Sequence, residues 1–550
     1  MREWWKGGTP WIWLTGGAVT ASMIMVFGLI VLILVRGFGA FWPHPVFVTE
    51  YAEPGAEPVT VLGELRRSET LTAETLRDAG VAVPDDLLLA TRHLIKSGNR
   101  DVTGSDFGYL VDEFMGEWVY PDDATVLERR EWGDFYGFPQ RLLDETGVVA
   151  EGDAVWPELT AAIRASNTVH DEIHRIEKGD IGRINYQIER VRLDRRRAEL
   201  QDRLTPELDA EMDARLVGLR EDYRVLEESL QALYAEADRY AVEMEVASGE
   251  SVTLRVRDIV SAWQPNTLSA FQKVGFFAGS FKEFILGYPR EANTEGGIFP
   301  AIFGTVVMVL VMSIIVTPFG ILAAIYLREY ARQGALLRII RISVYNLAGV
   351  PSIVFGVFGL GFFVYFIGGA IDQAFYPEAL PAPTFGTPGL FWASLTLALL
   401  TLPVVIVSTE EGLARIPSTI RHGSLALGAT KGETLWKVVV PLATPAMMTG
   451  LILAVARAAG EVAPLMLVGV VKLAPTLPID GNFPFLHLER KIMHLGFHIY
   501  DVGFQSPHAE AAEQLVYATA LVLVLLIVIL NLTAIMVRNR LRERFRAESD

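Results

Sequence analysis

Two full charges interrupt an apolar stretch near the C-terminal end of the sequence, ILAVARAAGEVAPLMLV at 452–468. Arg457 and Glu461 are four residues apart, the spacing of neighbours on one face of a helix. An arginine at the bilayer centre costs roughly 2.5–3.5 kcal/mol on insertion scales, so it usually faces a protein interior and has a partner. A guanidinium binds the oxygens of an anion through paired hydrogen bonds. We therefore predict that Arg457 lines a pathway for an oxyanion and is held by Glu461, although a structural ion pair between helices would produce the same pattern.

Weaker candidates lie in two other stretches. Asn346 and Ser352 flank a proline at the start of an apolar segment, where an opened helix would offer polar groups to an anion. Ordinary helix packing is the simpler explanation for both. His487, His494 and His498 include a pair at helical spacing, but no third ligand is evident, so we predict no metal site.

These candidates sit in a chain with the composition of a membrane protein that carries a polar domain. Its 550 residues are 51% hydrophobic, with a mean hydropathy of +0.31. About 20 apolar residues cross a bilayer core. Six stretches satisfy this length, and we predict a membrane span at each: 11–35, 298–327, 342–367, 389–408, 446–470 and 514–537. The first is too long for the apolar core of a signal peptide, so we expect it to be retained.

Basic residues in short loops predict the orientation of these spans. They gather after the second span, after the sixth, and before the first at Arg2 and Lys6. Six spans place all three groups on the cytoplasmic side, with both termini. The predicted parts are an N-terminal segment with the first span at 1–40, an external domain at 41–297, a transmembrane domain at 298–537 with a cytoplasmic loop at 409–445, and a basic cytoplasmic tail at 538–550.

The external domain holds the acidic charge of the chain. Residues 41–300 contain 28 Lys and Arg against 49 Asp and Glu, a net charge of −21, compared with −17 for the whole chain. Its first part mixes short apolar stretches with Gly and Pro, which indicates a small α+β unit. From 168 to 240 apolar residues recur at three- and four-residue steps, which predicts an antiparallel helical hairpin. We expect its first helix to begin at Thr168 and its second to be capped by Thr205. A β-hairpin is predicted at 242–257.

Motifs for catalysis are missing from the sequence. It contains no GxxxxGK[ST], HExxH, GxSxG or CxxC, and it has no cysteine. We therefore expect a protein that is not an enzyme by itself, that holds no cofactor in this chain and that has no nucleic-acid partner.

The loop at 409–445 has a recognisable pattern. A short amphipathic helix is predicted over 418–427, then a turn at Gly428 and a second helix that ends at Pro441 and Pro445. An ordinary connector is the simplest explanation. The loop resembles the EAA loop of ABC importer permeases, with Gly428 and Pro441 at the matching places. His422, Gly423 and Ser424 replace the usual Glu-Ala-Ala.

The resemblance becomes specific in four segments. NLAGVPSIVFGVFGL (346–360), EGGIFPAIFGT (295–305), SLALGATKGETLWKVVVP (424–441) and the stretch at 452–468 are similar to the PstA-type permeases of bacterial phosphate ABC transporters. This resemblance implies an α-helical polytopic membrane protein with six transmembrane helices, of the type I ABC importer permease class. The external α+β and helical-hairpin domain would then be an insertion between spans one and two.

The resemblance also implies that the chain lies in the lipid of the bacterial inner membrane and that it has several partners. They are a homologous phosphate permease subunit, two ATP-binding subunits that hold ATP and Mg, a periplasmic phosphate-binding protein, and inorganic phosphate as cargo. Loop residues that include Ala429, Thr430 and Lys431 would contact the ATP-binding subunits. Two alternatives stay open, a permease for sulfate or molybdate and a membrane-anchored envelope scaffold or sensor.

Overall fold

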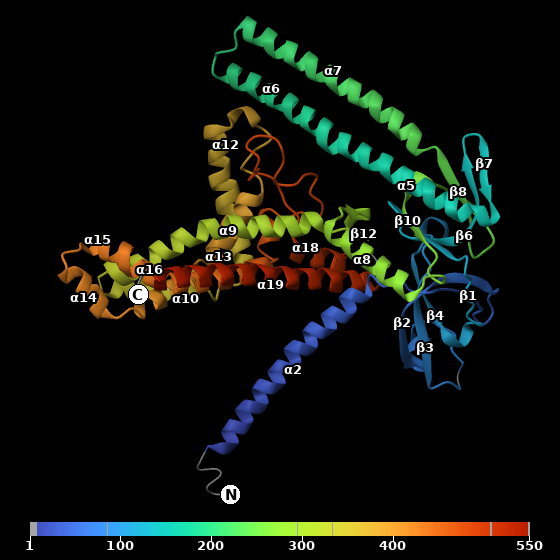
Figure 1. The fold of residues 1–550 in the computed structure, drawn as a ribbon, viewed down its shortest axis with the longest axis horizontal. Coiled ribbons are helices and arrows are strands. Elements are labelled where there is room, and N and C mark those ends of the chain that lie inside the picture. The colour runs from blue at the N-terminus through green and yellow to red at the C-terminus, as the bar shows by residue number, and fades with distance from the viewer. Residues whose placement is uncertain (1–7, 85, 294, 333, 506–508, 548–550) are drawn as a thin grey trace. The chain divides into compact units, whose positions relative to one another are not determined.

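The chain is divided by its internal contacts into two units. The computed structural model describes residues 1–550 except 1–7, 85, 294, 333, 506–508 and 548–550 (Figure 1). Arg2 and Lys6 therefore lie outside the described residues. We call residues 1–40, 284–289 and 297–550 the membrane unit, and residues 41–283 and 290–296 the insert unit.

Six helical segments of the described residues are long and apolar enough to span a membrane, as predicted. Three are built from one helix each, and the other three include a π-helical segment. Their elements are α2 (Thr9–Gly39); α9 (Phe299–Ile325) with η6 (Tyr326–Tyr330); α11 (Ser352–Phe358), η7 (Gly359–Gly368) and α12 (Gly369–Phe375); α13 (Leu390–Ala414); α15 (Lys431–Thr434), η9 (Leu435–Val439) and α16 (Val440–Gly460); and α19 (Ala509–Ala547). Shorter helices of this unit are α10 (Ala335–Leu347), α14 (Ser418–Ala426), α17 (Leu465–Val468) and α18 (Leu495–Tyr500).

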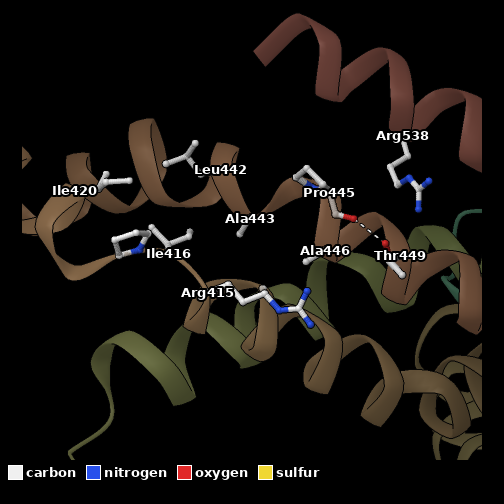
Figure 2. A pocket seen from close by; sticks show the side chains of 11 residues that line it. Arg415, Ile416, Ile420, Leu442, Ala443, Pro445, Ala446, Thr449 and Arg538 are labelled. Carbon is white, nitrogen blue, oxygen red and sulfur yellow. Dashed lines mark hydrogen bonds between the residues drawn. The ribbon is translucent and has the colours of Figure 1, made fainter. Parts of the chain in front are cut away.

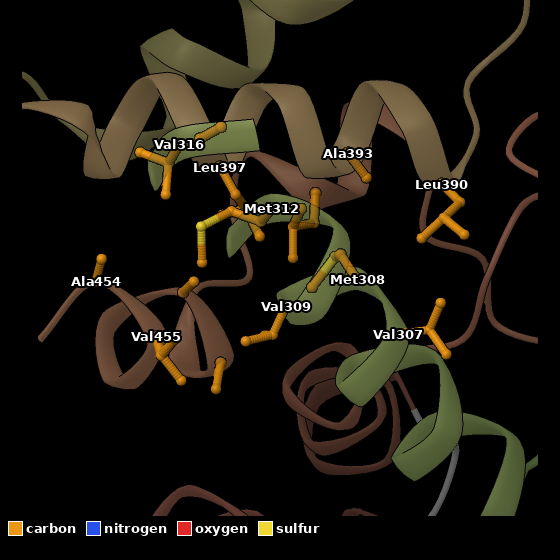
Figure 3. Close-up of a cluster of buried hydrophobic side chains, with 14 of the residues drawn as sticks. Val307, Met308, Val309, Met312, Val316, Leu390, Ala393, Leu397, Ala454 and Val455 are labelled. Carbon is orange, nitrogen blue, oxygen red and sulfur yellow. The ribbon is translucent and has the colours of Figure 1, made fainter. Parts of the chain in front are cut away.

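The core of the membrane unit lies between α9, α13 and α16 (Figure 3). Small residues let these helices approach closely, as is usual where helices pack in lipid. A Cβ on Gly412 would lie 2.4 Å from the Cβ of Ala446, and one on Gly450 would lie 2.7 Å from Ser408. These two contacts fix an antiparallel register of α13 against α16.

Two predicted spans are wrong at one or both ends. The predicted span 342–367 begins too early, because its first residues belong to α10 and the next helix starts only after Pro351. The predicted span 446–470 is displaced: a continuous helix begins at Lys431 and ends at Gly460. Pro441 and Pro445 lie inside this helix instead of ending it. Pro441 is tolerated because it stands in the first turn of α16, directly after the π-helical turn η9.

The insert unit contains two antiparallel sheets. One has the strand order β1-β2-β3-β4, and the other has the order β10-β5-β6-β8-β9 with β7 paired to β6. The strands are β1 (Val46–Tyr51), β2 (Val59–Thr72), β3 (Leu89–Lys96), β4 (Phe107–Val111), β5 (Thr125–Arg129), β6 (Phe135–Asp144), β7 (Gly147–Glu151), β8 (Tyr240–Glu245), β9 (Ser251–Arg255) and β10 (Ile259–Trp263). Strands β8 and β9 form the predicted hairpin. The short β11 (Pro289–Arg290) and β12 (Glu295–Gly296) pair near the second membrane span.

A pair of long helices extends from the second sheet. The first runs without a break through α5 (Val155–His174), η3 (Arg175–Ile181) and α6 (Gly182–Leu200), and α7 (Pro206–Ala237) returns beside it. The expected start at Thr168 is wrong, because its hydroxyl donates to the carbonyl of Arg164 inside the helix. The cap at Thr205 is confirmed, since its side chain accepts the N–H of Leu208.

A charged cluster of the insert unit holds the segment that leads to α9. Arg100 donates to Glu291 at 2.7 Å, and Lys96 pairs with Asp134 beside them. Glu295 is buried in this cluster, where desolvation and the Asp134 carboxylate raise its pKa to about 8. The folded cluster therefore favours the protonated form of Glu295.

Replacing Glu295 by Gln should stabilise the chain in a pH-dependent way. The folded pKa of about 8 exceeds the ordinary value of 4.5, so folding takes up a proton between them and stability falls as the pH rises. We expect Glu295→Gln to raise the unfolding temperature of the purified chain by several degrees at pH 8 and hardly at pH 5. The exposed Glu57→Gln is the control. A gain that is equal at both pH values would contradict this assignment.

Candidate functional site

One face of α16 is left open by the rest of the chain. Its buried face, which includes Gly450 and Ala454, packs on α13 and α9. The other face presents four exposed residues about one or two turns apart, Leu442, Thr449, Leu453 and Arg457, with the half-buried Ala446 at its edge toward α13, and we call these five residues the open stripe. Leu453 is 55% exposed although it lies in a membrane span. Because the stripe is mostly apolar, it is suited to lipid or to a protein partner, and Arg457 is its only charge.

Arg457 stands where the helix stops. Helix α16 ends at Gly460, and Glu461 has an extended backbone with ψ 134°. Glu461 is therefore not on the helix face that the spacing predicted, yet its Oε1 accepts from the Nε of Arg457 at 3.3 Å. A cation in the last turn is also stabilised by the carbonyl end of the helix dipole. Both side chains are accessible, 39% for the arginine and 18% for the glutamate, so the pair does not join two helices.

The helix ends deep within the membrane unit. Ala446 lies opposite Gly412, and Gly450 lies opposite Ser408. We extend this antiparallel register along both helices. It places Arg457 opposite Thr401, near the middle of the 25-residue α13. Irregular backbone at such a depth is tolerated where it is buried in protein or lines a cavity. The break after Gly460 thus has the geometry of a discontinuous span.

A second break lies between α10 and α11. Asn346 is exposed in the last turn of α10, and Ser352 is the half-buried first residue of α11. A cavity of about 470 Å³ brings Tyr345 and Ala348, beside this break, next to Leu453 on the open stripe. The structure therefore places the second break near the stripe, one turn from Arg457.

The loop between α13 and α16 is a compact helical turn. Gly428 has φ +91°, the left-handed conformation that favours glycine, directly after α14. Thr430 then caps α15 in a capping box with Glu433. The hydroxyls of Ser424 and Thr434 lie 2.9 Å apart and tie the two helices together.

This loop is anchored to the end of the second span. Arg421 donates to the Glu329 carboxylate at 2.9 Å, and the Nζ of Lys431 donates to the Glu329 carbonyl. Lys431 also lies over the ring of Tyr330, 4.7 Å from its centroid. The loop is therefore held as one body with the core helices.

The outer surface of the loop carries apolar groups that sequence reasoning missed. Leu427 is 91% exposed and Trp436 is 57% exposed. His422 and Gly423 are also exposed, and Ala429 is half-buried. Leu427 directly precedes the left-handed Gly428. An apolar residue at that place in the sequence is the signal that would have indicated an exposed apolar side chain.

The histidines of the following segment are buried. Burial lowers the pKa of His494 and of His498 to about 4, so both are neutral at pH 7. His494 caps α18 by accepting the N–H of Gly496, and His487 lies between Asp480 and Glu489. Across the described residues no group of three or more His, Cys, Asp or Glu could hold a metal ion.

Comparison with known proteins identifies relatives of the membrane unit. Residues 316–546 match the family described as "Binding-protein-dependent transport system inner membrane component". The phosphate transport system permease protein PstA 1 of Mycobacterium tuberculosis is 34% identical over 244 residues, 44% of this chain and 71% of that protein. PstA of Yersinia pestis is 32% identical over 247 residues, with coverages of 45% and 74%. A probable PstA of Methanocaldococcus jannaschii is 30% identical over 237 residues, with coverages of 42% and 73%.

The geometry of the loop is testable because the chain has no cysteine. We expect Ser424→Cys combined with Thr434→Cys to form a disulfide under mild oxidation, since their hydroxyls touch. Adding Gly428→Val should slow this closure several-fold, because a β-branched residue resists positive φ. Gly428→Asn is the matched control, since Asn tolerates that conformation. Equal rates in all three backgrounds, followed by gel shift, would contradict the turn.

Proposed function

Since the chain belongs to the PstA family of inner membrane transport permeases, we propose that it is the membrane-spanning subunit of an ATP-driven importer of inorganic phosphate. The protein is a multi-pass inner membrane protein with the type I ABC importer permease fold, and it is a transporter subunit rather than an enzyme. ATP and Mg would be bound by two separate ATP-binding subunits. Both termini would face the cytoplasm, and the insert unit would face the periplasm.

The observation that carries the proposal is the position of Arg457. It stands on the open stripe, at the end of a helix that stops at mid-depth. Its Nε is engaged by Glu461, while its two terminal amino groups have no partner among the described residues. These groups are suited to hold two phosphate oxygens. Glu461 would keep the empty site near neutral and so permit release, which transport requires as much as binding.

The open stripe would face a homologous permease subunit, so that the pathway runs between the two. Asn346 and Ser352 would contribute polar groups from the second break, close to Leu453. The loop with Leu427 at its surface would fit a groove of an ATP-binding subunit. His422, Gly423, Ser424 and Pro441 would shape this docking element, although the charged contact of the usual Glu-Ala-Ala is replaced.

The insert unit would help a periplasmic phosphate-binding protein deliver its cargo. Its net charge repels phosphate, and screening over about 8 Å at physiological salt does not reverse that sign. Delivery by a protein is therefore favoured over capture from solution. The helical pair of α6 and α7 is a suitable contact for that protein.

Replacing Arg457 should abolish uptake without preventing assembly. We expect Arg457→Ala to lower phosphate uptake by assembled proteoliposomes at least tenfold, because no other charge lies on the stripe. Arg457→Lys should be intermediate, since an ammonium does not bind two oxygens in parallel. Leu310→Ala, at a 52%-exposed position of α9 away from the stripe, is the control. Normal uptake by Arg457→Ala would refute the pathway role, and loss of assembly would favour a structural ion pair.

The same vesicles distinguish phosphate from other oxyanions. A tenfold excess of unlabelled sulfate should leave labelled phosphate uptake unchanged, whereas unlabelled phosphate should suppress it. Suppression by sulfate or molybdate would assign the chain to another oxyanion. Absence of any ATP-dependent uptake would favour a scaffold or sensor.

Replacing Leu427 should uncouple the ATP-binding subunits. We expect Leu427→Glu to reduce their co-purification and ATP-driven uptake several-fold, because a charge would be buried on docking. Leu88→Glu, at an 86%-exposed position outside α6 and α7, is the matched control. Unchanged uptake, together with no cross-link from Ala429→Cys to cysteines scanned over the ATP-binding subunit, would contradict the docking assignment.

A further inference from the structure

A second cavity lies between the end of α13 and the middle of α16 (Figure 2). Its volume is about 500 Å³. Arg415 reaches it from α13 and Arg538 from α19, so two guanidinium groups approach it from different elements. Leu442 and Ile420 supply an apolar wall, and Thr449 lies between the two arginines.

This cavity shares part of its lining with the cavity beside the open stripe. Arg415, Ala446 and Thr449 line both cavities, and Leu453 lines the one nearer to Arg457. A solute that leaves Arg457 along the stripe therefore meets Thr449 after two turns of α16 and Arg415 beside it. The open stripe thus connects two arginine sites.

The second site has a different charge balance from the first. Arg415 stands 4.0 Å from Glu411, four residues earlier, as Arg457 pairs with Glu461 four residues later. Arg538 adds a further positive charge to the cavity. The site with Arg457 is neutral when empty, whereas this cavity has two cations and one carboxylate at its edge.

We propose that the cavity between Arg415 and Arg538 is a second anion site, which binds inorganic phosphate at the cytoplasmic end of the pathway. The proposal rests on the proposed function, since it takes the cargo from there. Two guanidinium groups from different helices can each bind two phosphate oxygens. The side chain of Arg415 is 81% exposed, so water competes for the anion and the site favours release into the cytoplasm.

An anionic lipid headgroup shares this chemistry. Basic pockets at the cytoplasmic ends of transmembrane helices bind such headgroups, and the apolar wall would suit an acyl chain. We favour inorganic phosphate because Leu442, Ala446 and Thr449 of the open stripe, which continues to Arg457, line the cavity. Testing the transporter in lipids with and without anionic headgroups distinguishes a headgroup site from an inorganic phosphate site.

Thiol protection measures occupancy without relying on transport. Thr449→Cys places the only cysteine of the chain between the two arginines, in an assembled transporter whose partner subunits lack cysteine. In nanodiscs of zwitterionic lipid, we expect millimolar phosphate to slow its alkylation by the uncharged N-ethylmaleimide at least fivefold. Arg415→Gln and Arg538→Gln should each remove the protection, and Ala429→Cys should show none. Leu442→Cys serves if the first variant does not assemble.

Each outcome decides the assignment. Protection by phosphate that depends on both arginines supports the second anion site. This protection should persist in an Arg457→Ala background. A failure of the proposed pathway role of Arg457 can therefore be distinguished from a failure of the second site. Protection that appears only with phosphatidylglycerol, and not with phosphate, assigns a headgroup site and overturns the proposal. Alkylation unaffected by either overturns it as well.

Discussion

The arrangement of the membrane unit depends on one constraint, the cost of ending a helix inside an apolar layer. Carbonyl groups without partners cost several kcal/mol there, so a broken span needs polar compensation. At the end of α16 the guanidinium of Arg457 lies in the last turn and Glu461 follows it. The charge and the helix end therefore stabilise each other. The close packing of α13 on the opposite face leaves the side with Arg457 open.

Local signals in the sequence predicted local structure well. Gly428 and Thr205 were both identified by residue type, because positive φ and N-capping are properties of one or two residues. The six spans were equally clear, since apolar length alone defines them. Arg457 stood out because a charge in an apolar run needs a reason.

The helix break after Gly460 was not predicted, because the apolar run resumes at Val462, although Gly460 and Pro464 are the kind of residues at which helices stop. Nor was the open stripe, since both faces of α16 are apolar and only packing decides which is buried. The start of α5 was missed for a related reason: Thr168 looks like a cap, but the apolar period continues upstream through Ile163. Long-range packing decides which face of α16 is buried and where α5 begins, and no short pattern predicts either.

The continuous helical segment from Lys431 to Gly460 connects the loop between α13 and α16 directly to Arg457. Its 30 residues extend about 45 Å at about 1.5 Å per residue, and the π-helical turn η9 and Pro445 are the places where it can bend. A side chain about 6 Å from the axis moves by about 2 Å for a rotation of about 20°. A twist of Lys431 and its neighbours would thus be enough to turn Arg457 from one side of a pathway to the other.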